Sequence, residues 1–136
     1  MQPGDRPTNL NPSELGPPRG FSHVTVAGGM VWVAGQIGAD ETGALVDPAD
    51  VVAQFGRAIR NIVIALDAAG CKPEDTVKLT YFVTDLSIYK QNLGAIGESY
   101  RQVFGRHYPA TTLVEVSSLF DRDAMVEIEA VAVRPQ

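Results

Sequence analysis

The sequence predicts a single α+β domain, in which a mixed sheet of about six strands carries two helices on one face. Several short runs alternate apolar and polar residues at the period of a strand, and two longer segments repeat apolar residues at the period of a helix. Strand-like runs come in pairs at both ends of the sequence, and helical segments separate the runs in the middle. That order combines hairpins with helical crossovers, and a length of 136 residues suits one compact domain.

Proline and polar residues dominate residues 1–19, so we expect an irregular N-terminal arm there rather than a helix or a central strand. The folded domain is then expected over residues 20–136. It should begin with a hairpin, because the β-rich runs at 21–26 and 30–35 are separated by a segment with two glycines. A short strand is also expected near Leu45.

The clearest predicted element is a helix over residues 48–69. Asp47 is the expected N-cap, Pro48 suits the first helical position, and Gly70 is a natural stop. Apolar residues recur at helical spacing along it, namely Val51, Phe55, Ala58, Ile62, Leu66 and Ala69.

The next predicted elements are a strand in the run TVKLTYFVTDL, a second helix and two closing strands. The second helix should run from Ser87 to Phe104, and the closing strands should cover 111–117 and 124–133. Two helices can cover only one face of such a sheet. We therefore expect another copy of the protein to cover the other face.

Charge and cysteine content limit the classes of binding partner and the cellular compartment that we expect. The net charge is −5 and the basic residues are scattered, which argues against nucleic acid and against an anionic membrane surface. The single cysteine, Cys71, cannot form an intrachain disulfide, and the sequence begins without an apolar leader, so we expect a cytoplasmic protein. No Cys/His cluster has the spacing of a metal site. Small molecules and other protein chains are the expected partners.

Two glutamates stand out on the last predicted strand. Glu127 and Glu129 are two residues apart, so they share a face with apolar neighbours. On the preceding strand, Thr111, Leu113 and Glu115 share a face in the same way. If the two strands pair antiparallel, polar groups from both would line one pocket, where burial raises a carboxyl pKa and suits proton transfer. The alternative is a rim position for each acid, paired with an arginine.

The same two strands carry a family resemblance. The run PATTLVEV at 109–116 and the run VEIEAVAV at 126–133 resemble the signature of the RidA (YjgF) family of imine and enamine deaminases. The segments 27–37 and 67–86 resemble that family as well, so the similarity covers nearly everything after residue 20. The resemblance implies a chorismate-mutase-like fold and a homotrimer with its sites between subunits. It also implies cofactor-independent hydrolysis of reactive imines, such as 2-aminoacrylate, to an oxo acid and ammonia.

Family site residues map onto this sequence with two departures. The resemblance assigns Glu127 to orienting the attacking water, Phe21 to an aromatic position that lines the cleft, and Gly35 to a backbone amide in the site. Thr111 stands where the family deaminases have a substrate-binding arginine, and Leu113 stands where they have a cysteine. An arginine holds a carboxylate with two charge-assisted hydrogen bonds, whereas a threonine offers one neutral hydroxyl.

The departure at Thr111 leaves several hypotheses open. Arg106 would supply a cation from another direction, or it is a solvated loop arginine. The first functional hypothesis is a deaminase with shifted specificity, for instance toward an aminomuconate-type enamine. The second is a non-catalytic trimer that binds a metabolite or a partner protein, and the third, ribonuclease activity, is disfavoured by the acidic charge. His23 is a candidate for the pocket edge, and Cys71 is either a small loop residue or a thiol activated by its neighbour Lys72.

Overall fold

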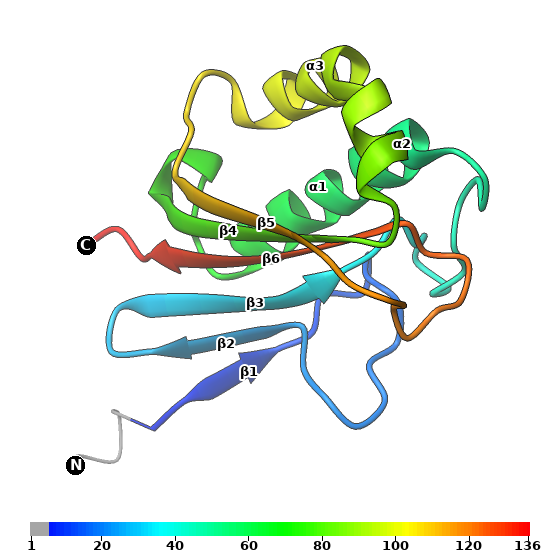
Figure 1. The fold of residues 1–136 in the computed structure, drawn as a ribbon. Helices are drawn as coiled ribbons and strands as arrows, with labels where there is room; N and C mark the ends of the chain where they lie inside the picture. Colours follow the sequence, from blue (N-terminus) through cyan, green and yellow to red (C-terminus); the bar gives the residue numbers. More distant parts are fainter. Residues whose placement is uncertain (1–5) are drawn as a thin grey trace.

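The computed structural model describes residues 6–136 and shows one mixed sheet with its helices packed on one face (Figure 1). The strands are β1 (Thr8–Leu10), β2 (Val24–Ala27), β3 (Met30–Gln36), β4 (Thr76–Val83), β5 (Ala110–Glu115) and β6 (Val126–Val133). The helices are α1 (Val51–Ala68), α2 (Leu86–Gln91) and α3 (Leu93–Phe104), with a short 3-10 turn at Pro73–Asp75. The predicted α+β class and six-stranded mixed sheet are confirmed.

The strand order is β1-β2-β3-β6-β4-β5, so β6 lies in the middle of the sheet between β3 and β4. Strands β4 and β5 form the one parallel pair of the described sheet, and the other neighbours are antiparallel. The antiparallel pairing considered for the last two strands is therefore wrong. β4 separates β5 from β6, because the α2–α3 crossover returns the chain parallel to β4 on its outer side.

Helix α1 follows its predicted apolar stripe but begins one turn later than expected. The side chain of Asp50, not Asp47, caps it and accepts hydrogen bonds from the backbone amides of Val52 (3.0 Å) and Ala53 (3.1 Å). Asp47 instead has a φ of +46° in the preceding turn. The helix ends at Ala68, and Gly70 follows with a φ of +78°, as a glycine stop requires.

The predicted second helix is two helices. The helical conformation is interrupted at Asn92, which is the C-cap of α2 and the N-cap of α3. The side-chain amide of Asn92 donates to the carbonyl of Ile88 (2.8 Å). That hydrogen bond satisfies a free carbonyl at the end of α2 and lets α3 start in a new direction over the sheet (Figure 1).

The predicted irregular arm contains one edge strand, β1, which pairs antiparallel with β2. Residues 1–5 of the arm lie outside the described residues. After β1 the arm remains attached to the domain, since Leu15 is buried and the side chain of Asn11 accepts a hydrogen bond from the His23 amide (2.8 Å). Near Leu45 the chain forms only an isolated bridge to Ala39, not a strand.

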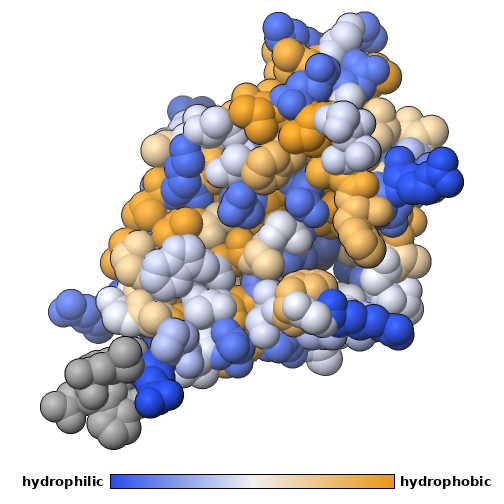
Figure 2. Space-filling model, turned by 60° about the horizontal axis from the view of Figure 1, so that its bottom comes forward, coloured by the Kyte–Doolittle hydropathy of each residue, from blue (hydrophilic) through white to orange (hydrophobic). Residues whose placement is uncertain are grey.

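The core fills the space between the helices and the sheet, and the opposite sheet face has no helix over it. Its largest fully buried apolar side chains are Phe55, Ile59, Ile62, Leu66, Leu79 and Ile128. On the open face, Trp32 and Val133 are each 44% exposed. With the bottom of the molecule turned forward, apolar and polar side chains are mixed across the surface (Figure 2). Among the described residues, no helix is long and apolar enough to cross a membrane.

Candidate active site

Glu127 projects from β6 onto the open face of the sheet, where its neighbour on β3 is a glycine. The register of β3 against β6 shifts between Val33 and Gln36, and Gly35 lies in that irregular segment. A Cβ added to Gly35 would lie 2.7 Å from Cδ and 2.8 Å from Oε1 of Glu127. The carboxyl therefore lies directly against the Gly35 backbone, and any side chain at position 35 would displace it.

The environment of Glu127 favours the protonated carboxyl. The side chain is half-buried, and burial is the main cause that raises its pKa above the ordinary 4.5, with the charge of Glu129 as a second cause. A carboxyl with a raised pKa can accept and return a proton closer to neutral pH. The assignment of Glu127 to orienting the attacking water stays a prediction.

Thr111 and Leu113 lie on the opposite face of the sheet from Glu127. On β5 these two residues pair with Leu79 and Tyr81, whose side chains are buried under the helices. The Thr111 hydroxyl donates to the carbonyl of Pro109 (2.9 Å). A single chain therefore does not bring Thr111 and Glu127 into one pocket, contrary to the arrangement considered from the sequence.

Phe21 lies at the entrance to β2 and is 53% exposed. Its ring packs edge-on against His23 at a centroid distance of 5.2 Å. The amide of Ala34 donates to the carbonyl of His23 (2.9 Å), which places the Phe21 segment beside Gly35. Phe21 and Gly35 thus lie on neighbouring segments, and a shared site with Glu127 stays a prediction.

His23 is a buried structural residue rather than a pocket-edge group. Its Nε2 donates to the carbonyl of Gly16 (2.6 Å), and its Nδ1 accepts from the side-chain amide of Gln36 (3.0 Å). Both ring nitrogens are therefore occupied, and the ring holds the arm against β3. Cys71 is also buried, and burial raises the pKa of its thiol, so the activated thiol considered from the sequence is not favoured.

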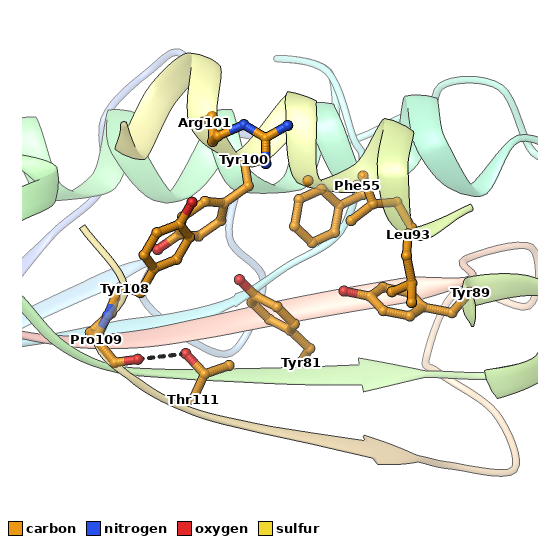
Figure 3. Close-up of a pocket in the computed structure, with 11 residues that line it drawn as sticks. Phe55, Tyr81, Tyr89, Leu93, Tyr100, Arg101, Tyr108, Pro109 and Thr111 are labelled. Atoms are coloured by element: carbon orange, nitrogen blue, oxygen red, sulfur yellow. Dashed lines mark hydrogen bonds between the residues drawn. The ribbon is translucent and has the colours of Figure 1, made fainter. Parts of the chain in front are cut away.

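The helix face carries a cavity of about 490 Å³ between α3 and the strands β4 and β5 (Figure 3). Its wall is rich in aromatic side chains, which are Phe55, Tyr81, Tyr89, Tyr100 and Tyr108. Thr111 and Arg101 also line it. Arg106, the arginine predicted from the sequence, is exposed and does not line the cavity.

Comparison with known proteins places the chain in a family. The family model described as Endoribonuclease L-PSP, which represents the RidA (YjgF) proteins, matches residues 12–134. The chain belongs to the RidA family. The resemblance of the 109–116 and 126–133 strands to this family is therefore confirmed.

Curated RidA relatives match over almost the whole chain. A 2-iminobutanoate/2-iminopropanoate deaminase of Salmonella typhimurium is 37% identical over 131 residues, which span 93% of this chain and 94% of the relative. A RutC family protein of Pyrococcus abyssi is 37% identical over 126 residues, or 92% of both chains.

Solved RidA structures share the fold. The Escherichia coli YjgF gene product superposes with a TM-score of 0.80 at 33% identity, covering 94% of this chain and 99% of that one. Escherichia coli TdcF, solved with bound serine, gives the same TM-score, identity and coverage.

The tyrosine-lined cavity of this RidA protein was not predicted from the sequence. Tyr81, Tyr89 and Tyr100 lie on the apolar faces of three elements, where the period alone does not distinguish a core side chain from a cavity wall. The available signal was chemical, because a tyrosine in an apolar stripe carries a hydroxyl that requires a partner or a cavity. Within residues 6–136, no group of three or more His, Cys, Asp or Glu side chains could hold a metal ion.

Proposed function

We propose that this chain is a cofactor-independent imine or enamine deaminase with altered substrate specificity. The observation that carries the proposal is the half-buried Glu127 carboxyl, which lies against Gly35 in a chain 37% identical to a 2-iminobutanoate/2-iminopropanoate deaminase. The single, buried Cys71 suits a reducing compartment, and we place the reaction in the cytoplasm.

The site is proposed to lie between two copies of the chain, within a homotrimer. Glu127 and Thr111 are on opposite faces of one sheet, so both can contact one substrate only if they come from different copies. Exposed apolar side chains such as Trp32 and Val133 support burial of the open face in an interface of this kind.

Glu127 has the chemistry for both proton transfers of the hydrolysis. The oxygen of a water molecule bonds to the imine carbon while the Glu127 carboxylate accepts one of its protons. That proton then passes from the carboxyl to the nitrogen and gives the neutral carbinolamine. The carboxylate next accepts the hydroxyl proton of the carbinolamine and delivers it to the amino nitrogen, so the C–N bond breaks as the C=O bond forms and ammonia leaves. An imine and one water molecule thus give an oxo compound and ammonia, and Glu127 regains its starting state.

The altered specificity follows from Thr111. Its neutral hydroxyl is engaged with the Pro109 carbonyl, so it does not replace the charge of an arginine. Loss of a charge-assisted hydrogen bond weakens binding by about 1.5–3 kcal/mol. Small imino acids, which bind mainly through their carboxylate, should suffer most.

Ammonia release tests the reaction directly. We expect the wild-type protein to accelerate ammonia release from a freshly generated imine, and Glu127→Gln to abolish the acceleration while it keeps the size and fold of the site. The comparison should include 2-aminoacrylate and a larger, aminomuconate-like enamine. If no imine is hydrolysed faster than in buffer, the deaminase proposal fails.

The alternative is a non-catalytic trimer that binds a small ligand or a partner protein. The absence of a cation at Thr111 favours it, because the family cleft has then lost a substrate contact. Binding of an oxo acid without any turnover would support this alternative. Light scattering tests the trimer in both cases, and a monomer would contradict a site between copies.

A further inference from the structure

The cavity on the helix face has an unusual inner wall. Tyr81 and Tyr89 are 8% and 6% exposed, and their hydroxyls point into the cavity (Figure 3). Among the cavity tyrosines within residues 6–136, only Tyr100 has a partner for its hydroxyl, which donates to the carbonyl of His107. The hydroxyls of Tyr81 and Tyr89 are therefore two donors that face the cavity with no acceptor from the described part of the chain.

Both hydroxyls remain donors at neutral pH. Burial raises the pKa of Tyr89 to about 12, and burial also raises the pKa of Tyr81. A polar group that loses its water without gaining a partner costs about 1–3 kcal/mol. A molecule that fills this cavity must therefore supply acceptor atoms to the two hydroxyls.

A cation is positioned at the rim of the same cavity. Arg101 lies one turn after Gly97 on α3, and both residues line the cavity. A Cβ on Gly97 would lie 3.2 Å from a terminal guanidinium nitrogen of Arg101. The absent side chain at position 97 therefore leaves room for the guanidinium over the cavity, where Figure 3 shows it.

We propose that this cavity binds a 2-imino acid with a bulky aromatic side chain, whose carboxylate interacts with Arg101 and with the hydroxyls of Tyr81 and Tyr89. The aromatic body of the ligand would pack against the exposed ring of Tyr108, above the buried rings that form the inner wall. A three-carbon imino acid would leave most of the 490 Å³ to water. Arg101 thereby takes over the charge that Thr111 lacks.

That the ligand is an imine rests on the proposed function, because the cavity itself selects only the carboxylate and the aromatic body. The products of hydrolysis keep both groups, so binding can be measured without turnover. Suitable probes are phenylpyruvate, pyruvate (the same oxo acid without the ring) and 3-phenyl-1-propanol (the ring without the carboxylate).

Isothermal titration calorimetry on the intact protein should show that phenylpyruvate binds roughly 10–100-fold more tightly than pyruvate, because the ring is buried. Tyr81→Phe and Tyr89→Phe should each weaken phenylpyruvate binding roughly 2–10-fold, and Arg101→Gln roughly tenfold or more. Arg60→Gln is the matched control, since Arg60 is exposed on α1 and does not line the cavity. Circular dichroism confirms that each variant is folded.

The inference is overturned if phenylpyruvate binds no more tightly than pyruvate, if 3-phenyl-1-propanol binds as tightly as phenylpyruvate, or if the three substitutions act no more strongly than Arg60→Gln. If one of these results is found while the protein still releases ammonia from 2-aminoacrylate, only this inference fails and the deaminase proposal remains. If phenylpyruvate binds as expected but no imine is hydrolysed, the ligand site remains and the deaminase proposal fails.

Discussion

The carboxyl of Glu127 lies directly against the backbone of Gly35, with no room for a Cβ between them. Because Gly35 has no positive φ, its role is to leave space rather than to adopt a conformation closed to other residues. A methyl group at position 35 should therefore move the carboxyl without unfolding β3.

We expect Gly35→Ala to lower kcat/KM for imine hydrolysis by roughly 10–100-fold, because a small displacement of a reacting group is costly. The melting temperature should change little. Gly94→Ala is the control: an added Cβ meets nothing within 4 Å there, so activity should persist and α3 should gain about 0.5–1 kcal/mol. Unchanged activity in Gly35→Ala would show that the contact between Gly35 and Glu127 is not needed for the reaction.

The charge of Glu129 should be visible in the pH profile of the reaction. Burial and, second, Glu129 raise the pKa of Glu127, and the proposed mechanism uses the Glu127 carboxylate. Activity should therefore fall as the pH drops through this raised pKa. In Glu129→Gln the pKa of Glu127 falls, so the acidic limb of kcat/KM should move to lower pH, while the exposed Glu74→Gln leaves it in place. A limb that stays fixed or moves upward contradicts this assignment.

Thr111→Arg should redirect specificity toward small imino acids. The new side chain would project to the helix face of β5 and offer two charge-assisted hydrogen bonds to a carboxylate. Hydrolysis of 2-aminoacrylate should rise roughly 10–150-fold relative to that of a larger enamine. Steady-state rates on both substrates measure this ratio, and Thr111→Lys tests whether charge alone suffices. A ratio equal to that of the wild type would show that position 111 does not select the substrate.

Gln54 should be a large contributor to stability. It is fully buried on α1, and its amide nitrogen donates to the carbonyls of Asp47 (3.1 Å), Pro48 (3.0 Å) and Asp123 (3.2 Å). Its oxygen accepts from the Met125 amide (2.7 Å). Gln54→Leu leaves these groups unpaired, so we expect a loss of about 3 kcal/mol and a melting temperature lower by about 10 °C.

Calorimetry of Gln54→Leu beside Gln102→Leu isolates that effect. Gln102 is exposed on α3, and its substitution should change stability by no more than about 0.5 kcal/mol. Equal stabilities of the two variants would mean that water replaces the hydrogen bonds of Gln54.

Periodicity predicted the elements well where one face of a long segment is buried. The apolar stripe from Val51 to Leu66 predicted α1, because apolar residues that keep helical spacing over several turns are typical of an amphipathic helix. Its start was misplaced because Asp47 and Asp50 are both plausible caps, and only tertiary packing chooses between them. The strand at Thr8–Leu10 was missed because three residues carry almost no period.

The partners of each strand could not be obtained from the sequence. The role of Glu127 was taken from the family resemblance and stays a prediction, and no pattern in the sequence indicated that its carboxyl lies against Gly35. Whether Thr111 faces the same pocket depends on which strand lies between β5 and β6, and local pattern does not specify that. The two free tyrosine hydroxyls could not be predicted for the same reason, because their surroundings depend on which elements pack together.

The central position of β6 has a consequence for synthesis on the ribosome. Strands β1, β2 and β3 form one half of the sheet, and β4 with β5 forms the other, yet the two halves are joined only through β6, which follows all of them in the sequence. Until residues 126–133 leave the exit tunnel, the nascent chain carries two incomplete sheets whose inner edges are exposed. The domain should therefore complete its fold late in translation, when it is most dependent on chaperones.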